Sequence, residues 1–165
     1  NHCLYVEGGH VDVNNSTIAQ FYPFDGNRRS AIGFKAPIDT LDVRNSLVTG
    51  YGNDEVLWTP VEEEPLKFSF DHCVLRTEKM MTEDSLRFTH VVYEDVKDTT
   101  MYGEKHFSVF DTENLIYDFH LSAKSAAIGA ADPKTALPYD RNGLKREENK
   151  ADAGCFLYRE DKKEE

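Results

Sequence analysis

The chain has 165 residues, with 30 acidic against 19 basic residues and a formal net charge of −11. This length predicts one domain that is large enough to bury a core. The negative charge disfavours binding to the phosphate backbone of nucleic acids. Aromatic residues make up 12% of the chain, including ten Phe and eight Tyr, and this composition favours strands over helices.

The three cysteines, Cys3, Cys73 and Cys155, have spacings that indicate neither a disulfide framework nor a zinc site. We expect Cys73 to be buried as a small apolar side chain. No window approaches the roughly 18 apolar residues of a transmembrane helix, and no segment resembles a signal peptide. Because the first residue is Asn1, we expect a piece of a longer protein, with any targeting segment upstream.

An internal repeat is the most informative feature of the chain. Residues 11–18, 41–48 and 68–75 begin 30 and 27 residues apart and share one pattern of alternating apolar and polar residues followed by Asn or His, a small residue and an apolar pair. The alternation predicts a strand, a bend and a second strand. One such unit per period of about 30 residues is typical of a solenoid, in which each coil stacks on its neighbours.

The bend of each repeat predicts stacked ladders of equivalent residues. Asn15, Asn45 and His72 occupy the same position, where Asn tolerates a left-handed backbone. Two further ladders follow at the next positions, namely Ser16, Ser46 and Cys73, and Ile18, Val48 and Leu75.

Beyond Thr77 the pattern is less regular. Residues 87–93, 105–110 and 118–121 are predicted as further strands, and residues 155–158 as a final strand introduced by Gly154. Residues 53–65 and 95–104, rich in Pro, Gly and acidic residues, are predicted as protruding loops. Residues 1–6 repeat the corner-and-strand pattern only about half a coil before the first repeat.

Several motifs resemble right-handed β-helix (pectate-lyase-like) surface proteins of Bacteroidetes. They are the repeats at residues 14–18 and 45–48 and the closing segments at residues 125–132, 140–146 and 151–155. The chain departs from the family's closing pattern at Ala126, where Pro is usual, and at Gly129, where Asp is usual. The resemblance implies an exported, often lipid-anchored, envelope or secreted protein, with any anchor upstream of this chain. It implies no reaction, since this fold hosts both enzymes and passive binders.

The fold class we predict is all-β, a single-stranded right-handed parallel β-helix (solenoid) of pectin-lyase-like architecture. Residues 1–158 form the β-helix domain, and residues 159–165 form a charged tail that keeps strand edges from pairing with other chains.

Asp12 and Asp42 take the same outward position on successive coils, where two carboxylates about 5 Å apart repel unless a cation or proton lies between them. A calcium site is one interpretation and a solvated acidic ladder is the other. Arg44 is expected to pair with Asp71 one coil away.

Catalytic motifs are weaker. The six histidines lack the spacing of a metal site, and no serine or cysteine lies in a nucleophile elbow. Acidic pairs on adjacent coils match the separations that glycoside hydrolysis needs, but acidic residues are abundant enough to produce such pairs by chance. We interpret the run Glu62, Glu63 and Glu64 as a solvated loop.

Tyr22, Tyr51 and Trp58 follow the repeats and form a platform for sugar rings if they are exposed together. The favoured function is therefore a non-catalytic cell-surface or secreted module for adhesion or polysaccharide binding. One alternative is a polysaccharide lyase or glycoside hydrolase with part of its site upstream. A structural cap or spacer is the second.

Overall fold

The computed structural model describes residues 1–23, 26, 28–78 and 86–160. Within these residues the chain is almost all β, with parallel sheets and without an α-helix. The charged tail was predicted for residues 159–165, of which 161–165 lie outside the described residues.

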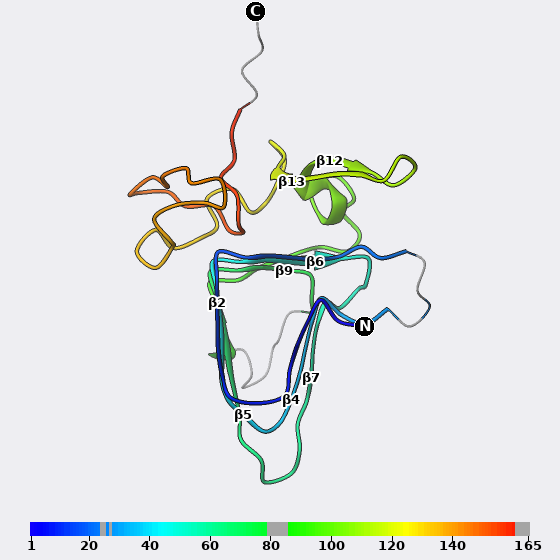
Figure 1. Ribbon diagram of the computed structural model, residues 1–165, viewed down its shortest axis with the longest axis vertical. Helices are drawn as coiled ribbons and strands as arrows, with labels where there is room; N and C mark the ends of the chain where they lie inside the picture. The colour runs from blue at the N-terminus through cyan, green and yellow to red at the C-terminus, as the bar shows by residue number, and fades with distance from the viewer. Residues whose placement is uncertain (24–25, 27, 79–85, 161–165) are drawn as a thin grey trace, which may run out of the picture.

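Three parallel sheets, here called A, B and C, surround the core (Figure 1). The chain passes through A, B and C in turn and then starts again, so strands far apart in sequence become neighbours. Sheet A holds β1 (Leu4–Val6), β4 (Ile32–Lys35) and β7 (Val56–Thr59). Sheet B holds β2 (His10–Asn14), β5 (Ile38–Arg44), β8 (Leu66–Asp71) and β10 (Phe88–Thr89). Sheet C holds β3 (Thr17–Gln20), β6 (Leu47–Gly50), β9 (Val74–Leu75) and β11 (Val92–Tyr93).

The register of sheet B confirms the predicted repeat. Leu41 lies opposite Val11 on one side and opposite Phe68 on the other. In sheet C, Val48 lies between Ile18 and Leu75, which is the ladder that the alignment predicted.

The corner between sheets B and C has the predicted backbone. Asn15, Asn45 and His72 have φ values of 43°, 49° and 50°, and His90 adds a fourth equivalent position at 52°. Asn and His are among the non-glycine residues that most often adopt this left-handed conformation. Residues 87–93, predicted as one strand, therefore form two short strands with a corner between them.

The interior is filled by apolar side chains that alternate along the strands, including Phe34, Ile38, Leu41 and Phe70, none more than 1% exposed. Cys73 is fully buried, as predicted.

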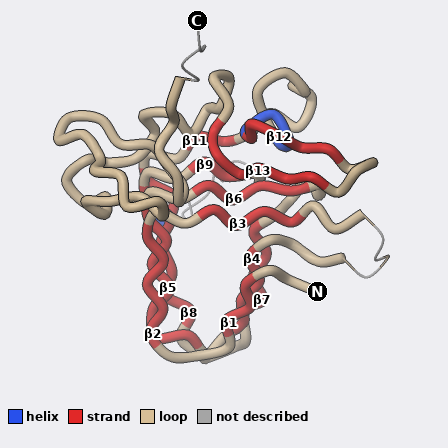
Figure 2. The backbone as a smooth tube through the Cα atoms, turned by 45° about the horizontal axis from the view of Figure 1, so that its top comes forward, coloured by secondary structure: helices blue, strands red, loops and turns tan. Residues whose placement is uncertain are grey.

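A second layer covers the outer face of sheet C (Figures 1 and 2). It contains the short 3-10 helix η2 (Gly103–His106), the antiparallel strands β12 (Phe107–Asp111) and β13 (Ile116–Leu121), and the irregular residues 122–160. Its apolar residues pack on Leu47 and Val74 from the outside. Because Val48 faces the coil interior while Leu47 faces this layer, every residue of β6 is buried.

Three other predictions of secondary structure need correction. Residues 53–65, predicted as a loop, contain β7, in which Val56 and Trp58 point inward while Leu57 is exposed. Strands are confirmed near residues 105–110 and 118–121, but they pair antiparallel with each other. Residues 155–158 form no strand, because side chains of the layer and of β3 bind their N–H groups, as Asp152 binds that of Tyr158 at 2.8 Å.

The start of the chain is also explained. Leu4–Val6 forms β1 of sheet A, whereas the first repeat begins in sheet B. The half-coil offset seen in the sequence is therefore the step from one sheet to the next.

Candidate functional site

Two of the three predicted platform residues lie at one edge of sheet C. Tyr22 follows β3 and Tyr51 follows β6, and the ring of Phe21 contacts that of Tyr51 edge-on with centroids 4.9 Å apart. Trp58 lies elsewhere, in sheet A, where its ring stacks on Phe34 at 6.0 Å and also contacts Phe68. The predicted platform of Tyr22, Tyr51 and Trp58 is therefore wrong for Trp58, because strand alternation in β7 turns its ring toward the core.

A shallow aromatic groove lies between the end of β3 and the β12–β13 hairpin. Its lining residues are Ala19, Gln20, Phe21, Tyr22, Pro23, Phe110, Leu115, Tyr117 and Phe119. We call this set the aromatic groove.

The rings of the aromatic groove pack on one another and leave two tyrosines exposed. Phe21 contacts Phe110 at 4.7 Å between centroids, and Phe110 contacts Tyr117 at 5.0 Å. Tyr22 is 54% exposed and Tyr117 is 39% exposed. The groove thus has packed aromatic rings with accessible ring surface. The residues on the β12–β13 side were not predicted from the sequence, because they are about 90 positions from Tyr22.

A polar hollow shares Phe21 with the aromatic groove. Its other lining residues include Tyr51, Arg76, Asp98, Tyr102, Glu104 and Lys105. The Arg28 guanidinium lies 5.5 Å from the Tyr51 ring centroid. Burial, followed by a hydrogen bond with Glu104, raises the pKa of Tyr51 well above its usual value, so its hydroxyl stays protonated and able to donate.

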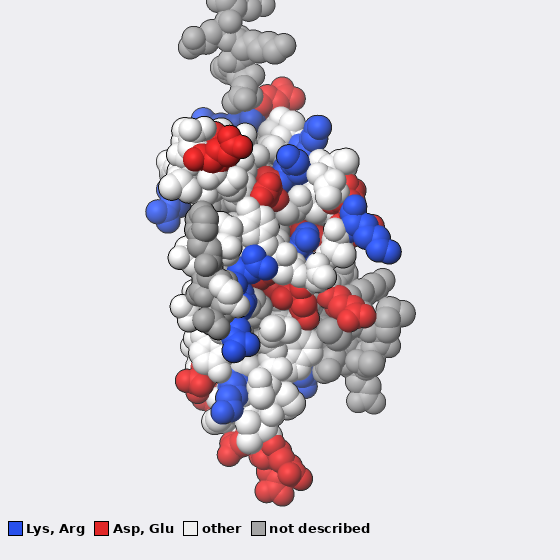
Figure 3. Space-filling view, turned by 90° about the vertical axis from the view of Figure 1, so that its right-hand side faces the viewer, with Lys and Arg blue, Asp and Glu red and all other residues white. Residues whose placement is uncertain are grey.

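The charge on this side of the molecule is mixed. Figure 3 shows Lys and Arg side chains interspersed with Asp and Glu and with wide uncharged areas. Such a face provides no continuous positive surface for a polyanion. The three glutamates Glu62, Glu63 and Glu64 are exposed, as expected for a solvated loop.

Asp12 and Asp42 are neighbours in the register of β2 and β5, as predicted. Both carboxylates have protein partners. Arg44 Nη2 donates to the two oxygens of Asp12 at 2.6 and 2.7 Å, and Ser69 Oγ donates to Asp42 Oδ1 at 2.6 Å. The predicted pairing of Arg44 with Asp71 is wrong, because Arg44 turns back to Asp12 while Asp71 accepts hydrogen bonds from Thr89 and His90.

A buried polar network has the composition of a Ser–His–carboxylate set. His106 lies between Ser125 Oγ, 2.8 Å from Nδ1, and Glu94 Oε1, 3.0 Å from Nε2. Arg76 donates to the other oxygen of Glu94 at 3.0 Å. The side chains of His106 and Glu94 have no exposed surface, so the network is closed to substrate. Its hydrogen bonds instead connect the C-terminal layer to the coils.

A second polar cluster, at the corner of sheets B and C, was missed by sequence reasoning. Asp71, His72 and His90 each offer one ligand atom, and these atoms lie within 4.8 Å of one another. Partial burial tends to raise the pKa of Asp71, but the hydrogen bonds from His90 and Thr89 and the nearby imidazole of His72 outweigh it and lower the pKa to about 2. The available signal was the alignment of residues 88–93 with 70–75, which places both histidines at one corner.

Comparison with known proteins adds no assignment. No protein-family model, no curated protein and no solved structure matches the chain. Across the described part of the chain, no helix has the length and apolar character needed to cross a bilayer.

Proposed function

We propose that the chain folds as a right-handed parallel β-helix and acts as a non-catalytic polysaccharide-binding module of a secreted or cell-surface protein. The fold part of the proposal is supported by the three parallel sheets that the chain visits in turn. Crossover connections between parallel strands of one sheet are right-handed in almost all proteins. The location and the kinship with Bacteroidetes surface proteins are supported by the sequence motifs alone.

The single observation that carries the binding proposal is the aromatic groove. Sugar rings present C–H faces that pack on aromatic rings, and tyrosine adds a hydroxyl at its wet edge. Tyr22 and Tyr117 both line the groove and are exposed. The ring of Tyr117 packs on Phe110, which in turn contacts Phe21. A neutral glycan fits this lining better than an acidic one, since none of the described lining residues is charged.

Binding without cleavage follows from the same lining. Glycoside hydrolysis generally requires two carboxyl groups placed on either side of the scissile bond. The described lining of the aromatic groove contains no carboxylate. We therefore place the groove among binding surfaces.

The test is affinity electrophoresis and calorimetry of the full chain against a panel of neutral and acidic polysaccharides. The informative variants are Tyr22→Ala and Tyr117→Ala, with Tyr139→Ala as the matched control, because Tyr139 is 55% exposed and lies outside the aromatic groove. We expect a neutral polysaccharide to retard the parent and Tyr139→Ala, and both groove variants to lose at least about fivefold in affinity, in line with loss of a stacked ring.

Three outcomes would overturn the proposal. The first is no retardation by any glycan, which leaves the structural cap as the better account. The second is release of reducing ends or of unsaturated sugar products during the same incubations, which identifies an enzyme. The third is an equal loss of affinity in Tyr139→Ala, which removes the aromatic groove as the binding surface.

A further inference from the structure

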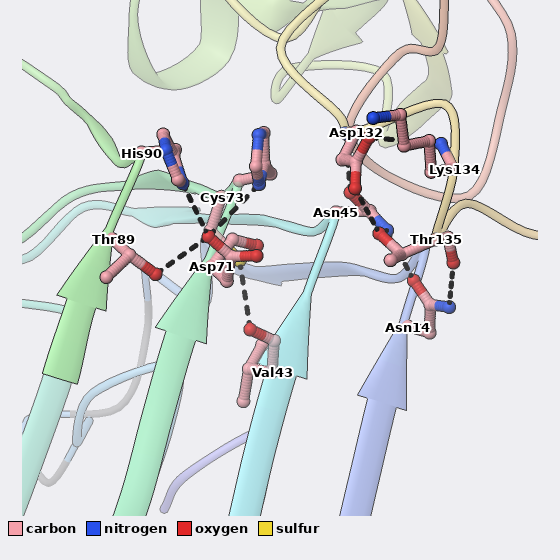
Figure 4. Close-up of polar contacts among 11 residues, drawn as sticks. Asn14, Val43, Asn45, Asp71, Cys73, Thr89, His90, Asp132, Lys134 and Thr135 are labelled. Carbon is pink, nitrogen blue, oxygen red and sulfur yellow. Dashed lines mark hydrogen bonds and ion pairs between the residues drawn. The ribbon is translucent and has the colours of Figure 1, made fainter.

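The corner cluster of Asp71, His72 and His90 has the geometry of a metal site. His90 Nδ1 lies 2.9 Å from Asp71 Oδ1 (Figure 4). His72 Nδ1 lies 3.0 Å from the same oxygen. Atoms that ligate one zinc ion at about 2.0–2.2 Å are separated from one another by little more than 3 Å. These three atoms therefore need only small movements to surround a cation.

The fold places these side chains together. Asp71 ends β8, and His72 and His90 are the left-handed corner residues of successive coils. Their imidazole rings stack with centroids 4.3 Å apart and planes inclined by 24°. Thr89, the register partner of Asp71, donates to Asp71 Oδ1 at 2.7 Å and orients the carboxylate.

One nitrogen of the cluster lacks a normal partner. His72 Nδ1 is buried and makes no hydrogen bond with any described residue, although it lies 3.0 Å from Asp71 Oδ1. A buried polar atom without a hydrogen bond calls for an explanation, and an ion is one of the accepted ones. A cation shared with Asp71 gives this nitrogen a partner.

The corner residues of the neighbouring coils differ from His72 and His90 in exposure, and this difference supports a role for the two histidines beyond forming the turn. Asn15 and Asn45, at the same corner, are 5% and 0% exposed, and their amides bind the C-terminal layer. The side chains of His72 and His90 are 26% and 68% exposed, so solvent and ions reach them. The corner residues are asparagines where the C-terminal layer covers them, and histidines in the two coils whose corner side chains are more exposed.

We propose that Asp71, His72 and His90 bind a divalent transition-metal ion of the zinc class at the corner between sheets B and C. Two imidazole nitrogens and one carboxylate oxygen form a common zinc ligand set, with water at the remaining position. Asp132 adds negative charge close to His72, and Thr89 donates a hydrogen bond to the carboxylate oxygen Oδ1 of Asp71 and so helps to orient it. This site is separate from the aromatic groove and does not rest on the glycan proposal.

The experiment is calorimetric titration of the full, metal-stripped chain with zinc chloride. The variants are His72→Asn and His90→Asn, because Asn occupies the same left-handed corner at positions 15 and 45 and should preserve the fold. His10→Asn is the matched control, since His10 is an exposed histidine 3.6 Å from an aspartate, Asp39. Cys3→Ser serves as a second control, because Cys3 is an exposed free thiol.

We expect one zinc ion per chain, and at least a tenfold weaker affinity in each corner variant, with both controls unchanged. The same titration with copper(II), followed by electron paramagnetic resonance, should show hyperfine coupling to two nitrogens in the parent and to one in either corner variant. Thermal melting of the metal-free variants checks that they remain folded.

Absence of zinc binding by the parent would overturn the proposal. So would an unchanged affinity in the folded corner variants, or a loss of affinity in Cys3→Ser, which would assign the ion to the thiol.

Discussion

The side-chain oxygen of Asn15 accepts a hydrogen bond of 2.7 Å from the backbone N–H of Leu137, 122 positions further along the chain. One coil away, Asn45 Oδ1 accepts a hydrogen bond of 2.8 Å from the N–H of Asp132 (Figure 4). These corner asparagines therefore serve two purposes. They allow the left-handed bend of each coil, and they attach the C-terminal layer to sheets B and C.

Asn45→Ala should destabilise the protein strongly. The substitution places alanine, which lacks the short polar side chain that lets Asn tolerate the left-handed region, at φ 49° and leaves the N–H of Asp132 without its acceptor. The expected loss is about 2–4 kcal/mol in the free energy of unfolding, the sum of the backbone and hydrogen-bond costs. Chemical denaturation followed by tryptophan fluorescence measures it.

Asn45→Gly separates the two causes. Glycine accepts the left-handed backbone freely, so this variant loses only the side-chain hydrogen bonds. We expect it to fall between the parent and Asn45→Ala. Equal stability of Asn45→Gly and the parent would contradict the role of the amide in attaching the layer.

The predictable part of the fold is the part that repeats. Register partners in sheet B share an apolar or polar type, so Val11, Leu41 and Phe68 align by eye. Sheet A carries no such signal, because β4 is almost wholly buried and β7 lies between acidic and proline-rich segments. Periodicity of two disappears when both faces of a strand are covered.

The sites were harder to predict for a different reason. Tyr22 and Tyr51 followed from their positions after aligned strands, but the opposite wall of the aromatic groove comes from the antiparallel hairpin β12–β13. The sequence contains no repeat that relates this hairpin to the coils. His72 and His90 are 18 residues apart, a spacing that becomes close contact only once β8 and β10 are known to pair.

The Glu94–His106 pair predicts a loss of stability in acid. Burial tends to raise the pKa of Glu94, but the hydrogen bond and charge of His106, with Thr49 and Arg76, outweigh it and lower the pKa below its usual 4.5. The unfolded chain therefore binds this proton more tightly than the native state does. The stabilisation is complete above pH 4.5 and is lost as the pH falls toward the lower native pKa.

Melting temperature measured from pH 7 to pH 3 should decline in the parent below pH 4.5. Glu94→Gln cannot titrate, so its decline over this interval should be shallower. At neutral pH it should be less stable by about 3–5 kcal/mol, since it breaks a buried charged network. The exposed Glu113→Gln is the control, and an acid decline in Glu94→Gln as steep as in the parent would contradict this assignment.

Gly154 is required where the C-terminal layer meets β3. Its φ is +100°, and a Cβ there would lie 2.7 Å from Thr17 Oγ1. Gly143, at φ +77°, has no heavy atom within 4 Å of such a Cβ. Gly143→Ala thus reports backbone strain alone, about 1–2 kcal/mol, whereas Gly154→Ala adds a steric clash and should cost about 1–2 kcal/mol more. Denaturant titration of the two variants tests this, and equal losses would show that the contact with Thr17 relaxes without cost.

Arg44 determines whether calcium binds at Asp12 and Asp42. Its guanidinium already neutralises Asp12, so we expect calcium at about 5 mM, in the range of weak extracellular sites, to leave the melting temperature of the parent unchanged. Arg44→Met keeps the aliphatic stem but leaves two carboxylates as register neighbours, about 5 Å apart.

Arg44→Met should lower the free energy of unfolding by at most about 1 kcal/mol, as for an exposed ion pair, and calcium should then raise its melting temperature. Adding Asp12→Asn to the variant should abolish that increase. If calcium instead stabilises the parent as much as Arg44→Met, the cation competes successfully with Arg44, and the ladder of Asp12 and Asp42 is a calcium site in the native protein.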